Sequence, residues 1–149
     1  MSNFNKTMDA GLLSAVISDN IREIKRLISE GVDVKARSKY GSTFLHLAAC
    51  NGKLRTVKYL VEEKEVDVKE KNNDGSTPLH FAADDGRLDM VKYFIEKGID
   101  VNIRNNYGVT PLRLAALHGH LETQRVKRKL RMFFYKQMEH MKRRSCNLI

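Results

Sequence analysis

One sequence pattern recurs along the chain at a nearly constant interval, and this recurrence constrains the fold more than any single residue does. The pattern appears as GSTFLHLAACNG, GSTPLHFAADDG and GVTPLRLAALHG, which begin at Gly41, Gly75 and Gly108. These glycines are 34 and then 33 residues apart. A period of this length is typical of a solenoid, in which each unit buries its apolar face against its neighbours. We therefore predict one domain made of stacked units.

A fourth and more divergent copy precedes the first clear one. Its apolar residues and its glycine fall about one period before their counterparts in the next unit, and they are Leu12, Ala15, Ile24 and Gly31. We predict a repeat domain over residues 9–121 that follows a flexible N-terminus at 1–8. Its units are 9–40, 41–74, 75–107 and a last one that covers 108–121 and continues onward. Residues 122–149 are predicted to form a separate tail.

Each unit reads as two helices followed by an extended loop. In the third unit, Thr77 can cap the first helix through its hydroxyl group, and Pro78 fits the first helical turn, where its missing N–H costs nothing. Gly86 ends this helix. The second helix has apolar residues at helical spacing and ends at Gly98. The loop IDVNIRNNYG combines β-tolerant residues with an Asn-Asn turn, which predicts a hairpin-like finger at right angles to the helices.

The segment TPLHFA at residues 77–82 matches the T-P-L-H-x-A signature of ankyrin repeats, whose period is about 33 residues. The chain thus resembles the ankyrin-repeat family from residue 41 to about 121. This resemblance implies an all-α solenoid of about four helix-turn-helix-finger units. Three departures occur: Phe44 replaces proline in the second unit, Arg113 replaces histidine in the fourth, and Lys64–Glu65 replaces the single glycine before the next finger. We expect that second connection to be looser.

His80 lies near Asp84 and Asp85, and these residue types also occur together in catalytic and metal sites. The recurrence of the pattern argues against that use, because the resemblance implies that His46 and His80 bond the backbone of the neighbouring unit. The sequence shows no second ligand cluster, no phosphate-binding glycine loop and no paired nucleophile. Neither of its two cysteines has the spacing of a zinc site or a disulfide framework. We predict a protein that is not an enzyme and has no cofactor or metal.

Positions that differ between units can recognise a partner, whereas positions that recur hold the fold. Ankyrin-repeat proteins bind partner proteins along a concave surface of fingertips and exposed ends of the first helices, and the resemblance implies the matching residues here. The finger residues are Arg37, Lys39, Tyr40, Lys71, Asn73, Asp74, Arg104, Asn106 and Tyr107, and the helix-end residues are Asp84, Asp85, Leu117 and His118. We expect the partner to be another protein, whose identity the sequence does not reveal.

Two features of this set predict the chemistry of the partner. Tyr40 and Tyr107 are aromatic residues with polar tips, a type enriched at binding hot spots, although each ring could instead pack along its own finger. Asp74, Asp84 and Asp85 place negative charge on the middle unit, which would suit a partner segment that carries lysine or arginine. The alternative is that these carboxylates are simply solvated.

The net charge of +9 is concentrated in the tail, because residues 121–149 carry nine basic residues against two acidic ones. The tail has an apolar stripe at helical spacing and no glycine or proline between residues 120 and 145, which predicts one long basic amphipathic helix. The stripe comprises Val126, Leu130, Phe133, Phe134, Gln137 and Met141. Such a helix would cap the last unit. The competing hypothesis is a tail that binds an anionic membrane or, with less support, nucleic acid.

The last residues place Cys146 fourth from the end, after the basic residues Lys142, Arg143 and Arg144, which resembles a prenylation box. The alternative is an unmodified, exposed thiol. No apolar run approaches the roughly 20 residues of a membrane span, and the start does not resemble a secretory signal. We expect a cytoplasmic protein that lipidation would bring to a membrane. Similar repeats occur in eukaryotic scaffolds and in proteins that intracellular bacteria deliver into host cells, so the source stays open.

Overall fold

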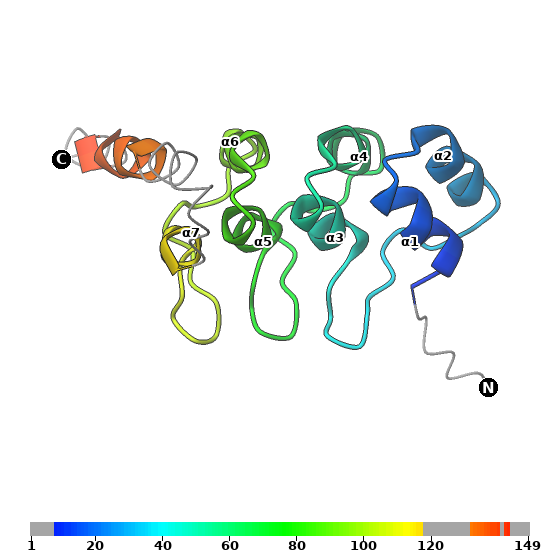
Figure 1. Ribbon diagram of the computed structural model, residues 1–149, viewed down its shortest axis with the longest axis horizontal. Coiled ribbons are helices and arrows are strands. Elements are labelled where there is room, and N and C mark those ends of the chain that lie inside the picture. Colours follow the sequence, from blue (N-terminus) through cyan, green and yellow to red (C-terminus); the bar gives the residue numbers. More distant parts are fainter. Residues whose placement is uncertain (1–7, 118–131, 141, 144–149) are drawn as a thin grey trace.

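The helices of the chain form two parallel rows, with loops projecting from one side of the array (Figure 1). The computed structural model describes residues 8–117, 132–140 and 142–143. The inner row consists of α1 (Ala10–Ile17), α3 (Phe44–Cys50), α5 (Pro78–Asp84) and α7 (Pro111–Leu117). The outer row consists of α2 (Ile21–Ser29), α4 (Leu54–Lys58), which continues into the π-helical turn η1 (Tyr59–Glu63), and α6 (Leu88–Glu96). The predicted all-helical array of helix-turn-helix-finger units is confirmed.

Adjacent inner helices pack directly on one another, from α1 to α3, from α3 to α5 and from α5 to α7. The contact surfaces are lined by alanines, and Ala48, Ala49, Ala82 and Ala83 are all fully buried. Small side chains allow two helix backbones to approach closely, so stacking follows from the Ala-Ala pair that recurs in the second, third and fourth units.

The second unit is one residue longer than the third, and the structure shows where the extra residue lies. The extra residue lies after the turn glycine Gly52, in the outer helix of this unit, where the π-helical turn η1 accommodates it. The helical segment ends at Glu63, and Glu65, two residues later, has a φ of 53° at the position where the neighbouring units have Gly31 and Gly98. A π turn is the usual way a helix accommodates a single insertion. The looseness expected of this connection stays a prediction.

The loops form the predicted hairpin-like fingers. Two backbone hydrogen bonds close the turn of each finger. The N–H of the first turn residue donates to the last residue of the turn, from Ser38 to Ser42 O at 2.9 Å, from Asn72 to Ser76 O at 3.0 Å and from Asn105 to Val109 O at 3.0 Å, and the N–H of the finger glycine donates back to the first turn residue. Neighbouring fingers are also joined, since the backbone N–H of Asn73 donates to Tyr40 O and that of Asn106 donates to Asp74 O. The fingers therefore form a continuous hydrogen-bonded edge along the array.

Gly75 occupies a position in this edge that no other residue can fill without strain. Its φ is 73°, and a Cβ atom added there would lie 2.4 Å from Oδ1 of Asn106. Gly98 offers a matched comparison, because its φ is 94° but a Cβ atom would meet nothing within 4 Å. We expect Gly98→Ala to cost about 1–2 kcal/mol through the left-handed backbone alone.

We expect Gly75→Ala to cost at least about 1 kcal/mol more than Gly98→Ala, because the finger of the next unit must move as well. Urea unfolding of both variants, followed by circular dichroism, measures the difference. Equal losses would mean that the contact between fingers adds nothing to stability.

The C-terminal segment that the structure describes is helical at residues 132–140 and 142–143 and lies beside α6 (Figure 1). Phe134 is fully buried in the core, and the Lys92 ammonium of α6 lies 5.8 Å from the centre of the Phe133 ring. Both aromatic residues belong to the predicted apolar stripe, and Met138 packs partly against the same core. Residues 118–131 lie outside the described residues, so a single helix from residue 120 stays a prediction.

Candidate partner-binding surface

In each of the three clear units the residue before the finger glycine stands at a fingertip, and it is tyrosine in two units and aspartate in the third. These residues are Tyr40, Asp74 and Tyr107, of which Tyr40 is 64% exposed and Tyr107 is 73% exposed. The Tyr107 hydroxyl donates to Oδ1 of Asp74 at 3.1 Å, and this hydrogen bond raises the pKa of Tyr107. The Lys39 ammonium lies 4.9 Å from the centre of the Tyr40 ring. The two rings thus face solvent and do not lie buried along their own fingers.

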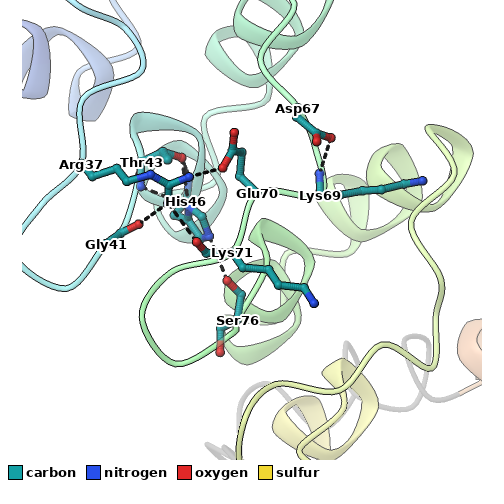
Figure 2. Close-up of polar contacts among 9 residues, drawn as sticks. All are labelled: Arg37, Gly41, Thr43, His46, Asp67, Lys69, Glu70, Lys71 and Ser76. Atoms are coloured by element: carbon teal, nitrogen blue, oxygen red, sulfur yellow. Dashed lines mark hydrogen bonds and ion pairs between the residues drawn. The ribbon is translucent and has the colours of Figure 1, made fainter.

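Several of the predicted finger residues also hold the fingers together. Arg37 donates from Nη1 to the backbone oxygens of Gly41 at 2.8 Å and Lys71 at 2.9 Å, and it pairs with the Glu70 carboxylate (Figure 2). Lys71 contributes its carbonyl to this cluster, whereas its side chain points away from it (Figure 2).

Three further finger residues are engaged in the same way. The Asn73 and Asn106 amides donate to the Lys39 and Asn73 carbonyls, respectively, while Arg104 donates to its own finger at Gly108 O. Substituting any of these residues would therefore change stability as well as any partner contact.

The two histidines of the recurring pattern bridge consecutive units. His46 Nε2 lies 3.0 Å from Ser76 O, and its Nδ1 lies 3.1 Å from the backbone N of Thr43 (Figure 2). His80 repeats the arrangement with Val109 O at 3.0 Å and Thr77 N at 3.1 Å. In each ring Nε2 therefore donates and Nδ1 accepts, which requires a neutral imidazole.

Burial lowers the pKa of His46 to about 4 and also lowers the pKa of His80. A neutral, fully bonded imidazole has neither a proton nor a lone pair to offer a substrate. The predicted bond from each histidine to the backbone of the neighbouring unit is confirmed.

The helix-end residues contain a contact that the sequence did not reveal. The Cys50 thiol of α3 donates to the Asp85 carboxylate at the end of α5, with 3.0 Å between Sγ and Oδ2. Burial, together with this hydrogen bond, raises the pKa of Cys50 to about 12. Cys50 is consequently protonated at neutral pH and a poor nucleophile.

A pocket of about 170 Å³ opens between α5, α7 and the two fingers that lead into these helices. We call it the third-unit pocket; its lining residues are Ser76, His80, Phe81, Asp84, Asn105 and Leu114. Sequence reasoning named Asp84 as a partner-binding residue but missed Phe81 and Leu114. Both occupy the variable position of T-P-L-H-x-A, and both are half-buried. The sequence did contain a signal for Phe81 and Leu114, because an apolar residue recurs at this position although the position lies outside the core face of the helix.

The remaining predicted residues lie at or beyond the end of α7. Leu117 is described and is 63% exposed, whereas His118 and Cys146 lie outside the described residues. Among residues 8–117, 132–140 and 142–143, no group of three or more metal-ligating side chains comes together. Within the same ranges no helix is long and apolar enough to cross a membrane.

A family model described as ankyrin repeats in three copies matches residues 12–105 and 64–126 of the chain. Among curated proteins, the chain is similar to the mitochondrial disaggregases of Bos taurus and Homo sapiens, with 43% identity over 53 residues in each case. The matched segment is 36% of this chain and 8% of each disaggregase.

Proposed function

Because the chain belongs to the ankyrin-repeat family, we propose that it is a non-enzymatic adaptor that binds a segment of another protein between its fingertips and inner helices. The supporting observation is the contrast between two sets of repeat positions. The Thr-His pairs are buried and make the same bonds in successive units, whereas the fingertip residues Tyr40, Asp74 and Tyr107 are exposed and are not the same in every unit. Exposed aromatic residues on a rigid edge can bind a partner without a large loss of side-chain entropy.

The disaggregase match does not extend this proposal to a further activity. The match covers 53 residues, which is about 8% of each disaggregase. Most of each disaggregase therefore lies outside the matched segment. We propose protein binding alone for this chain.

Membrane or nucleic-acid binding by the basic tail, lipidation of Cys146 and a cytoplasmic location remain predictions from the sequence. Two observations distinguish the tail hypothesis from our proposal. Binding that requires residues 122–149 and is lost at high salt would favour the tail. Binding that survives deletion of those residues would favour the finger-helix surface.

The proposal predicts that fingertip substitutions weaken binding without unfolding the protein. For a partner captured from a eukaryotic lysate and then purified, Tyr40→Ala, Tyr107→Ala or the double change Asp84→Ser and Asp85→Ser should each lower affinity. We expect at least one of the three to cost about 1 kcal/mol or more. Isothermal titration calorimetry measures the affinity.

The matched control is Arg22→Ala, because Arg22 is exposed on α2, in the outer row. Its affinity should equal that of the unchanged protein. If all three fingertip and helix-end variants bind as tightly as Arg22→Ala, the partner site is elsewhere.

A further inference from the structure

We propose that the third-unit pocket receives one lysine or arginine side chain of the partner segment, as the central anchor of the complex. This inference rests on the proposed function and adds the chemistry of the ligand to it. Its first support is the size of the pocket. A volume of about 170 Å³ is well below the roughly 300–1,000 Å³ of sites that hold small-molecule ligands, so the pocket suits a single side chain.

The walls of the third-unit pocket suit a side chain with an apolar stem and a polar end. Phe81 from α5 and Leu114 from α7 supply apolar surface, and both are half-buried. Ser76 and Asn105, from the fingers that lead into α5 and α7, supply polar groups at the wall. Lysine and arginine have this combination of a long apolar stem and a hydrogen-bonding head.

The charges at the third-unit pocket favour a cation. The Asp84 carboxylate lines the pocket, and the next residue, Asp85, adds an exposed carboxylate at the same helix end. Among the described residues that line the pocket there is no lysine or arginine. His80 is neutral, because its Nδ1 accepts a hydrogen bond from the Thr77 N–H while its Nε2 donates to Val109 O. The Lys71 charge acts on His80 from the finger, but Lys71 is exposed and does not line the pocket.

A cation also fits better than the two other kinds of side chain. An acidic side chain would be repelled by the Asp84 carboxylate, and an apolar side chain would offer that carboxylate neither a hydrogen bond nor an opposite charge. The Phe81 ring, which is only partly buried, offers a further attraction, because an aromatic face binds an ammonium or guanidinium group.

A random peptide library displayed on phage and selected on the full-length protein tests this inference. We expect the selected peptides to share one lysine or arginine flanked by apolar residues. A selected peptide, synthesised with that residue replaced by norleucine, should bind the unchanged protein at least about tenfold more weakly, which corresponds to about 1.4 kcal/mol.

The protein variant Asp84→Asn should weaken the unmodified peptide by a similar factor while the melting temperature stays close to that of the unchanged protein. The control is Asp89→Asn, which removes an exposed carboxylate on α6 outside the pocket lining and should leave affinity unchanged. If Asp84→Asn does not fold, the norleucine peptide on the unchanged protein decides the question.

The possible failures can be told apart. Selected peptides that share no basic residue, or a norleucine peptide that binds equally well, would overturn the anchor and leave the proposed function standing. Two outcomes would overturn both the anchor and the proposed function. Either no peptide is enriched, or the enriched peptides bind equally well to a protein that carries Tyr40→Ala, Tyr107→Ala and Asp84→Asn together.

Discussion

Replacing His80 by alanine is expected to lower the free energy of unfolding by about 3 kcal/mol. The imidazole is buried and links two units, since its Nε2 donates to Val109 O at 3.0 Å and its Nδ1 accepts from the Thr77 N–H at 3.1 Å. Alanine would leave both backbone groups without these partners, at about 1–3 kcal/mol for each buried unpaired group, and would add a cavity. Urea unfolding monitored by circular dichroism measures the loss.

The fourth unit supplies a matched control for this substitution. Arg113 occupies the position of His80 one repeat later, but it is exposed. Arg113→Ala should change stability by no more than about 0.5 kcal/mol. Similar losses for the two variants would show that the histidine bridge contributes little to the stacking of units.

Lowering the pH from 6.5 to 4 is expected to destabilise the protein by roughly 3 kcal/mol through His46 alone. Burial lowers the pKa of His46 to about 4 in the folded protein, against about 6.5 when it is unfolded. The unfolded chain therefore binds more protons in this range, so stability falls as the pH falls. The contribution is fully present above pH 6.5 and is lost by about pH 4, at roughly 1.4 kcal/mol for each pH unit.

Carboxylates also titrate near pH 4, so the range from pH 6.5 to 5 gives the cleanest measurement. There His46 should account for roughly 2 kcal/mol. His80 acts in the same direction, because burial lowers its pKa too. The control is His46→Gln, which should be less stable at pH 7 but should lose less on acidification. Parallel stability curves for the two proteins would rule out His46 as the titrating group.

The features that could be predicted from sequence are those that depend only on residues within a single unit. Thr77, Pro78 and Gly86 mark the start and end of α5 because capping and left-handed termination involve residues only a few positions apart. The histidine bridge could be inferred because its pattern recurs, and a recurring residue has the same role in each unit.

Contacts specific to one pair of units could not be read from the sequence. Asp19 has a φ of 54° and stands in the first unit where later units have a turn glycine. Its carboxylate accepts hydrogen bonds from the Thr56 N–H at 3.2 Å and the Thr56 hydroxyl at 2.6 Å, and so caps α4 from the preceding unit. Lys53 at the N-cap of α4 makes no such bond. The partners are 37 residues apart, and only the stacking of α1 on α3 brings them together.

The sequence by itself determined the repeat length, the helix boundaries and the order of the units, because these depend on backbone conformation and on spacing along the chain. The tertiary structure decided which variable residues are available to a partner. In the tertiary structure, Arg37 and Asn73 form hydrogen bonds between neighbouring fingers, and the Cys50 thiol donates to Asp85. Phe81 and Leu114 come together in the lining of one pocket. Each of these contacts depends on the distance between one unit and the next. That distance is set by the packing of the buried alanine faces of two units, so the sequence of a single repeat does not determine it.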